Sequence, residues 1–199
     1  MLKARLVSTR LEAGCDEVGR GCLAGPVVAA AVILPPRLSH PDLIDSKKLS
    51  ASKRETMAEW IRDRALSWGI CEVSPAEIDR INIQNASFLA MTRAVQALVP
   101  LPEHLLIDGN RFRSELTIPF DCIVKGDNRI GSIAAASILA KTHRDALMHH
   151  LHLDHPDYGW NTNVGYPTTA HRRAIANLGI TEYHRKSFHL KAEQLSLSL

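Results

Sequence analysis

Apolar and polar positions along the chain follow two patterns, one typical of strands and one typical of helices. Short apolar runs predict strands at residues 11–18, 27–34, 69–73, 104–107 and 120–124, the first two forming a hairpin. Longer runs with apolar residues at helical spacing predict helices at residues 51–68, 75–82, 83–99, 131–150 and 168–178. Ser50 is a suitable N-cap for the first helix. Strands interleaved with helices indicate an α/β fold with a mixed sheet flanked by helices.

The composition changes beyond Leu151, where Pro, Gly and Asn become frequent before the last predicted helix. We therefore expect a main domain at residues 1–150, a small helical C-terminal appendage at 151–193, and a tail at 194–199. The chain has 199 residues and 45% hydrophobic content, which is enough for a proper core. No apolar run has the length of a membrane span or the form of a signal peptide, so we expect a cytoplasmic protein.

Two acidic residues, Asp16 and Glu17, stand side by side at the end of the first predicted strand, directly before Gly19, Arg20 and Gly21. Adjacent strand residues point to opposite faces, so both carboxylates converge on one ion only where the strand ends or bends. The glycines permit such a bend and let a ligand approach the main chain. Magnesium is usually held by one or two carboxylates plus substrate phosphates. A phosphate-handling enzyme is the first hypothesis, and a solvated acidic pair before a turn is the alternative.

Further acids stand where predicted strands end. Asp108 ends the fourth predicted strand and precedes Gly109, and Asp127 follows the fifth strand within Lys125-Gly126-Asp127. Three such strand ends suggest carboxylates gathered at one edge of a sheet. A cluster of this kind is suited to phosphodiester hydrolysis, because bound metal ions generate the nucleophile and stabilise the leaving oxygen.

Six segments of the chain resemble bacterial ribonuclease HII, in the same order and over residues 11–188. They are GCDEVGRG (14–21), DSKKLS (45–50), LIDGN (106–110), KGD (125–127), AASILAK (135–141) and GYPT (165–168). The resemblance implies a ribonuclease H-like fold in which the appendage completes the substrate cleft. It also implies a metal-dependent endonuclease, using Mn²⁺ or Mg²⁺, that hydrolyses the RNA strand of RNA–DNA hybrids. Such an enzyme incises duplex DNA 5′ of single embedded ribonucleotides and leaves 3′-hydroxyl and 5′-phosphate ends.

The resemblance also assigns roles to individual residues. The catalytic residues, which are also the metal ligands, would be Asp16, Glu17, Asp108 and Asp127. The substrate ribose would be recognised by the main chain of Gly19, Arg20 and Gly21, and by Tyr166, which would contact the 2′-hydroxyl and stack on the neighbouring sugar. The 2′-hydroxyl is the chemical group that distinguishes RNA from DNA. Without the resemblance, a tyrosine beside a proline more often packs in a turn or core.

Other polar residues are candidates for phosphate contacts. Lys47 follows a turn and could hold a phosphate near the scissile bond, while Asp45 organises that loop. Ser137 and Lys141 lie four apart on one face of a predicted helix and could both face the substrate backbone. Val164 stands where relatives usually have a lysine, so phosphate binding there would be weaker.

The net charge of +3 permits nucleic-acid binding, which depends on where the charge clusters. Basic residues that could line a phosphate-binding surface are Lys47, Lys48, Lys53, Arg54, Lys141, Arg144, Arg172, Arg173, Arg185 and Lys186. The alternative for each cluster is a solvated helix face, which is favoured for Arg172 and Arg173. The cysteines Cys15, Cys22, Cys71 and Cys122 lack CxxC spacing and are expected to be buried free thiols. The histidines His149, His150, His152 and His155 are expected to cover an exposed helix end rather than to bind zinc.

The C-terminal residues Gln194, Leu195, Leu197 and Leu199 resemble a bacterial sliding-clamp-binding peptide, although the tail could equally pack onto its own domain. The expected partners are thus RNA–DNA hybrid, ribonucleotide-containing DNA duplex and the sliding clamp, for a monomeric protein without a membrane contact. Two other function classes remain open, a non-catalytic nucleic-acid-binding protein and a junction resolvase. The intact acids disfavour the first, and the Gly-Arg-Gly and Tyr166 elements disfavour the second.

Overall fold

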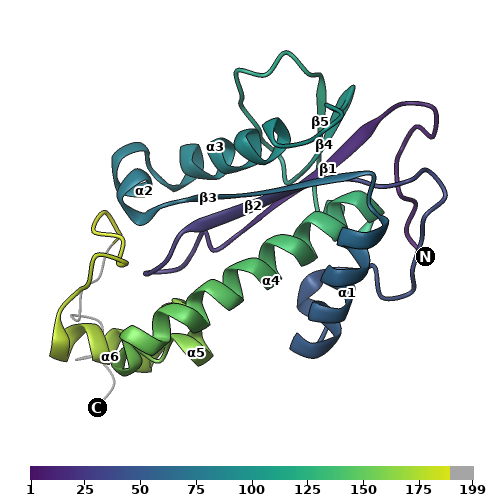
Figure 1. Cartoon of the computed structure of the whole chain (residues 1–199). Helices are drawn as coiled ribbons and strands as arrows, with labels where there is room; N and C mark the ends of the chain where they lie inside the picture. Colours follow the sequence, from purple (N-terminus) through teal and green to yellow (C-terminus); the bar gives the residue numbers. More distant parts are fainter. Residues whose placement is uncertain (189–199) are drawn as a thin grey trace.

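The computed structural model describes residues 1–188 and centres on a mixed five-stranded sheet (Figure 1). The strands are β1 (Glu12–Val18), β2 (Val27–Ile33), β3 (Ser67–Val73), β4 (His104–Asp108) and β5 (Phe120–Ile123), in the spatial order β3-β2-β1-β4-β5. The first three pair antiparallel, so the predicted β1–β2 hairpin is confirmed, and β4 and β5 extend the sheet in parallel with β1. The mixed sheet flanked by helices that the sequence predicts is therefore confirmed.

Helices cover both faces of the sheet (Figure 1). They are α1 (Ala51–Arg64), α2 (Pro75–Ile81), α3 (Ile83–Gln96), α4 (Gly131–Asp154), α5 (Trp160–Asn163) and α6 (Thr169–Leu178), with short 3₁₀ turns η1 (Ser46–Lys48), η2 (Gly126–Asn128) and η3 (Pro156–Tyr158). Strand β2 is buried on both faces, since Val28, Ala30 and Val32 pack with α1 and α4 while their neighbours pack with α3. None of the helices in residues 1–188 is both long and apolar enough to cross a membrane.

Three helices end several residues away from their predicted ends, among them α3, which ends at Gln96 rather than at 99. Helix α1 ends at Arg64 rather than at 68, because Ser67 and Trp68 pair with Ile33 and Val32 of β2 and begin β3. Sheet pairing thus overrides the helical pattern, as tertiary contacts often do. Helix α4 continues to Asp154, so residue 150 falls inside a helix, and the division of the chain into 1–150 and 151–193 stays a prediction.

The four cysteines are free, as expected, but only two are buried. Cys15 and Cys22 are inaccessible, whereas Cys71 and Cys122 are partly exposed, so the prediction of four buried thiols is wrong for the latter pair. The reason is their position on β3 and β5, the two edge strands, where a strand has a neighbour on one side only.

Candidate active site

Two of the candidate acids, Asp16 and Asp108, lie at the carboxyl edge of neighbouring parallel strands. Cys15 of β1 lies opposite Ile107 of β4, so the next residues along each strand, Asp16 and Asp108, reach the same edge. The backbone N–H of Glu17 donates a hydrogen bond of 2.7 Å to Asp16 Oδ1. Asp16 is buried, with 7% of its surface exposed.

Asp127 is brought to this edge by the turn η2 after β5. The backbone N–H of Gly126 donates to Asp108 Oδ1 at 2.6 Å, and the side-chain amide of Asn128 donates to Asp127 Oδ1 at 2.9 Å. Lys125, immediately before the turn, has the left-handed backbone conformation, with φ of 55°. Asp127 is buried as well. Carboxylates at three positions far apart in the sequence are thus held at one edge of the sheet.

Burial and mutual repulsion shift the ionisation of these acids. Burial raises the pKa of Asp16 well above its ordinary value, and the charges of Glu17 and Asp108 raise it further. The pKa of Glu17 is also raised by burial, although Arg20, whose Nη1 lies 3.0 Å from Glu17 Oε1, opposes the shift. Burial raises the pKa of Asp108 against the hydrogen bond from Gly126. Like charges in low dielectric favour the protonated forms in this way.

A divalent cation would relieve this repulsion, because an opposite charge nearby favours the ionised carboxylates. The oxygen donors of Asp16, Glu17 and Asp108 are of the type that hard cations prefer, so the residues fit such an ion. Within residues 1–188, no three Asp, Glu, His or Cys side chains form a ready-made metal cage. A cation here would therefore complete its coordination with water and substrate phosphate, which is the usual habit of magnesium.

A pocket of about 460 Å³ opens beside Asp108 and Asp127. Its other lining residues are Asp45, Lys47, Lys48, Lys125 and Asn128. Asp45 Oδ1 accepts a hydrogen bond of 3.0 Å from the Lys47 N–H, so Asp45 organises this loop as expected. Lys48 donates a hydrogen bond to Asn128. The charge of Lys47 opposes the raised pKa of Asp108, which places an exposed cation next to the acids.

The glycines of the Gly-Arg-Gly turn differ in their surroundings. Gly19 has φ of +91°, and a Cβ there would lie 2.3 Å from Arg144 Nε, so both conformation and packing require glycine. A Cβ at Gly21 would meet no atom within 4 Å. The fold therefore leaves an open space at Gly21 through which another molecule can reach the main chain. The side chain of Arg20 is 52% exposed and pairs with Glu17.

Ser137 and Lys141 lie on α4 as predicted but have protein partners. Ser137 is buried, its hydroxyl lies 3.0 Å from that of Ser46, and it hydrogen-bonds Asp16 so as to lower the pKa of that carboxyl. Lys141 Nζ donates to Asp145 Oδ1 at 2.6 Å. In this conformation the two side chains contact the protein rather than solvent, and Ser137 supports the acidic group directly.

Tyr166 lies next to the Gly-Arg-Gly turn although the two are far apart in sequence. The backbone N–H of Leu23 donates to the Gly165 carbonyl at 2.8 Å, and burial and the neighbouring Cys22 raise the pKa of Tyr166. The tyrosine remains 39% exposed. Val164, the departure noted in the sequence, has φ of 41°, a conformation that is unfavourable for a β-branched residue.

Comparison with known proteins identifies the family. A family model described as Ribonuclease HII matches residues 13–191. The chain belongs to the ribonuclease HII family. It is 57% identical to the "Ribonuclease HII" of Parabacteroides distasonis over 197 residues, covering 99% of each chain. It is 55% identical to the "Ribonuclease HII" of Bacteroides thetaiotaomicron over 199 residues, covering 100% of each.

Solved structures share the fold of this chain. The ribonuclease H2 of Pyrococcus horikoshii superposes with a TM-score of 0.78 at 21% identity, covering 92% of this chain and 96% of that one. The ribonuclease HII in a PCNA complex from Archaeoglobus fulgidus gives 0.74 at 28% identity, covering 94% and 98%. As a ribonuclease HII family member, the chain is an endoribonuclease that hydrolyses the RNA strand of RNA–DNA hybrids.

Several basic residues of this ribonuclease HII family member are not where the sequence analysis expects them. Arg144 and Arg185 are fully buried and bond main-chain carbonyls, so the prediction that they line a phosphate-binding surface is wrong. Arg54 is half-buried in an ion pair with Asp145. No sequence signal marks these arginines as internal, because arginine is usually exposed.

The histidine prediction is wrong in part. His149 and His150 are exposed on α4, as expected, but the ring of His155 packs edge-on against Trp160 at 5.6 Å and Tyr183 at 5.5 Å. The helix ends near this point and the chain folds back into the aromatic core of the C-terminal part. His155 is therefore a packing residue.

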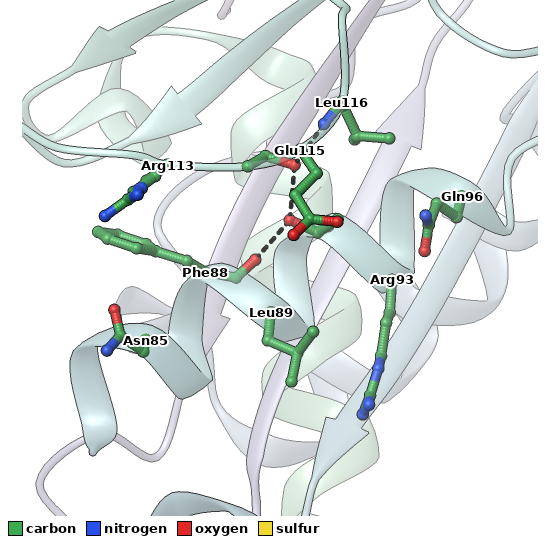
Figure 2. A pocket seen from close by; sticks show the side chains of 10 residues that line it. Asn85, Phe88, Leu89, Arg93, Gln96, Arg113, Glu115 and Leu116 are labelled. Carbon is green, nitrogen blue, oxygen red and sulfur yellow. Dashed lines mark hydrogen bonds between the residues drawn. The ribbon is translucent and has the colours of Figure 1, made fainter. Parts of the chain in front are cut away.

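A larger pocket among the described residues is separate from the acids. It measures about 700 Å³. Figure 2 shows that it lies between α3 and residues 113–116. There the Thr92 hydroxyl lies 2.8 Å from the Phe88 carbonyl and 2.9 Å from the Ser114 hydroxyl. Glu115 is its single acidic lining residue. None of the four candidate acids lines this pocket, so it is separate from the candidate active site.

Proposed function

We propose that this endoribonuclease, with Mg²⁺ or Mn²⁺, incises duplex DNA on the 5′ side of a single embedded ribonucleotide and leaves 3′-hydroxyl and 5′-phosphate ends. The observation that carries the proposal is the position of Asp16 and Asp108 at one sheet edge, beside a Gly-Arg-Gly turn with open space at Gly21. Acids at one sheet edge are suited to the hydrolysis of a phosphodiester. The open space at Gly21 is suited to the binding of a sugar close to the main chain.

The metal ligands in this proposal are Asp16, Glu17, Asp108 and Asp127. Their support is the raised pKa values of the first three, which indicate carboxylates held together without enough cationic charge. Bound Mg²⁺ or Mn²⁺ would supply an activated water and neutralise charge at the leaving oxygen. Ser137 and the Gly126 N–H orient the carboxylates of Asp16 and Asp108 through hydrogen bonds.

Ribose recognition in this proposal is the task of Gly19, Arg20, Gly21 and Tyr166. A 2′-hydroxyl both donates and accepts hydrogen bonds, so main-chain groups can recognise it. The open space at Gly21 supports such an approach, and the half-exposed ring of Tyr166 lies close enough to the turn to contact the same nucleotide.

Phosphate contacts in this proposal centre on Lys47, with Lys141 and Ser137 as further candidates. Lys47 is supported by its exposure and by its electrostatic effect on Asp108. An ammonium group on a flexible stem can follow a phosphate as a point charge. Lys141 would first have to leave Asp145, and Ser137 to leave Asp16.

One panel of substrates tests the proposal. The protein is incubated with a DNA duplex carrying one ribonucleotide, an all-DNA duplex, an RNA–DNA hybrid and a four-way junction, each with Mg²⁺, Mn²⁺ or EDTA. We expect metal-dependent cleavage of the hybrid and a single incision 5′ of the ribonucleotide, with ends that ligase or phosphatase treatment identifies. Cleavage of the junction or of all-DNA duplex would contradict the proposal.

We further propose that Gln194, Leu195, Leu197 and Leu199 bind the bacterial sliding clamp. These residues lie outside the described residues 1–188, so the support comes from their sequence. The Archaeoglobus fulgidus relative has been solved as a PCNA complex, which shows that one family member binds a sliding clamp. Binding would bring the nuclease to newly replicated DNA.

A further inference from the structure

The Gly-Arg-Gly turn and the Tyr166 loop are held together by one side chain from α4. The guanidinium of Arg144 donates to the carbonyls of Ala24 at 3.0 Å and Pro26 at 2.9 Å, just beyond the turn. Its third hydrogen bond, of 2.8 Å, goes to the carbonyl of Val164, directly before the Tyr166 loop. Arg144 has 0% of its surface exposed. A single buried group thus joins two loops that are far apart in sequence.

The two loops also touch each other around this guanidinium. A Cβ at Gly165, where φ is +84°, would lie 2.4 Å from the Ala24 carbonyl oxygen, and a Cβ at Gly19 would lie 2.3 Å from Arg144 Nε. The Cys22 thiol lies 3.8 Å from the Val164 carbonyl oxygen, between the loops. A shift of the Arg144 side chain would therefore change its contacts with Gly19 and with the Val164 carbonyl together.

A second buried arginine supports the same segment. Arg185 donates to the carbonyls of Gly25 and Arg20, each at 3.0 Å, and its backbone N–H donates to the Leu23 carbonyl at 2.8 Å. Within residues 1–188, neither arginine forms a salt bridge with a carboxylate. Burying an unpaired charge is costly unless its hydrogen bonds are made. Main-chain carbonyls accept from all three guanidinium nitrogens of Arg144 and from two of the three of Arg185. The carbonyls of the two loops are therefore oriented towards the buried guanidinium groups.

We propose that Arg144 is a positioning residue for ribose recognition, which sets the Gly-Arg-Gly turn and the Tyr166 loop in one fixed arrangement. This inference rests on the proposed function for its role in the reaction, and on the hydrogen bonds above for the arrangement itself. Lysine cannot replace the planar fork, because an ammonium is a compact point charge without fixed donor directions. The guanidinium is thus required for its geometry as well as its charge.

The test compares Arg144→Lys with Arg5→Lys. Arg5 is a matched control, since it is also a buried arginine that donates to carbonyls, those of Leu34 at 2.8 Å and Arg10 at 3.0 Å, in the N-terminal segment. The test measures the rate of thiol labelling by N-ethylmaleimide with peptide mass spectrometry. Labelling of Cys22 reports separation of the two loops. Labelling of Cys15, which is buried in β1, reports unfolding of the whole domain in the same sample.

We expect Arg144→Lys to speed labelling of Cys22 by about tenfold or more while Cys15 stays protected. Its kcat on the single-ribonucleotide duplex should fall about tenfold or more, since small misplacements of substrate-binding groups are costly. Arg5→Lys should change neither readout. Cys22 remaining protected, or Cys15 and Cys22 reacting together, would overturn the positioning role.

The activity readout separates this inference from the proposed function. If Cys22 is labelled faster in Arg144→Lys while cleavage is unchanged, Arg144 holds the loops but their arrangement does not serve the reaction. That result would overturn the inference and would count against ribose recognition by these loops. If the wild-type protein fails to incise at a ribonucleotide, the proposed function fails by itself. The labelling of Cys22 in Arg144→Lys still decides whether this arginine holds the two loops.

Discussion

The backbone N–H of Gly126 donates a hydrogen bond of 2.6 Å to Asp108 Oδ1. This contact joins the end of β4 to the turn after β5, and it places Asp127, the next residue, beside Asp108. The left-handed conformation of Lys125 directs the chain into the turn. One hydrogen bond from the main chain to a side-chain carboxylate thereby helps to bring together two acids that the sequence separates by the whole of β5 and its preceding loop.

Neutralising any one of the four acids should abolish most cleavage without loss of the fold. We expect Asp16→Asn, Glu17→Gln, Asp108→Asn and Asp127→Asn to lose about 100-fold or more in kcat, since even supporting partners of metal ligands cost 10- to 100-fold. Substrate affinity in EDTA should persist or increase, because repulsion of phosphate is relieved. Cleavage and binding assays check this, and full activity of Asp108→Asn would refute the metal assignment.

The Asp16→Asn substitution should stabilise the metal-free protein. The folded-state pKa of Asp16 lies above its unfolded value, so its contribution favours folding only at low pH and is lost as the pH rises through the folded pKa. At neutral pH in EDTA, Asp16→Asn should therefore raise the thermal midpoint. Asp63→Asn, an exposed acid on α1, is the control and should leave the midpoint unchanged.

Alanine at the two glycines of the Gly-Arg-Gly turn should have different effects. Gly19→Ala should lower stability by at least about 1 kcal/mol, because left-handed backbone disfavours a side chain and the new methyl meets Arg144. Gly21→Ala should leave the thermal midpoint close to wild type, since the Cβ enters open space, yet raise KM for the single-ribonucleotide duplex. Unchanged KM in Gly21→Ala would show that substrate does not use this space.

Loss of Tyr166 should impair one substrate more than another. We expect Tyr166→Ala to reduce incision at a single ribonucleotide more than cleavage inside a long RNA–DNA hybrid, because the contact with the 2′-hydroxyl and the adjoining sugar is lost. Tyr166→Phe keeps the ring without the hydroxyl and separates stacking from hydrogen bonding. Parallel kinetics on both substrates check this, and equal losses would contradict a role in sensing the RNA-to-DNA junction.

Two buried imidazoles near the Tyr166 loop are held in their neutral forms. His171 Nδ1 lies 2.9 Å from the Tyr166 carbonyl oxygen, so it donates, and His171 Nε2 accepts from Trp160 Nε1 at 3.1 Å. His184 Nδ1 accepts from the Thr181 N–H at 3.0 Å. Burial, and then the electrostatic repulsion that His171 and His155 exert when protonated, lowers the pKa of His184 from 6.5 to about 4.

This depressed pKa predicts a loss of stability in mild acid. The unfolded chain binds the proton more readily, so the contribution of His184 is complete above pH 6.5 and is lost as the pH falls towards about 4. The loss amounts to roughly 3 kcal/mol. Urea unfolding at several pH values should show a smaller dependence in His184→Asn than in wild type or in the exposed-site control His149→Asn. An identical dependence in all three would contradict the assignment.

Deleting residues 194–199 should leave cleavage of short duplexes unchanged and abolish binding to the bacterial sliding clamp. Calorimetric titration with purified clamp measures the binding, and a variant with Leu195, Leu197 and Leu199 replaced by Ser is the control that retains chain length. A markedly lower thermal midpoint in the truncated protein would show instead that the tail packs on its own domain. Persistent clamp binding would show that it is irrelevant.

The sequence alone was enough to predict the layered α/β fold and the four candidate acids. Strand and helix periods are local properties, and they placed Asp16 and Asp108 at strand ends that parallel pairing then brought together. Where local pattern and sheet pairing disagree, the pattern fails: Trp68 fits a helix by its spacing but pairs with Val32 in β3.

Only the tertiary structure decided which basic side chains are exposed and what holds the Gly-Arg-Gly turn and the Tyr166 loop in place. Arginine is usually a surface residue, yet Arg144 and Arg185 are buried and donate to carbonyls of residues more than a hundred positions away. His155 likewise packs against Trp160 and Tyr183 in an aromatic core instead of covering an exposed helix end. Periodicity records which face of an element is apolar. It does not record which distant main chain will satisfy a buried charge, because that partner exists only once the chain has folded.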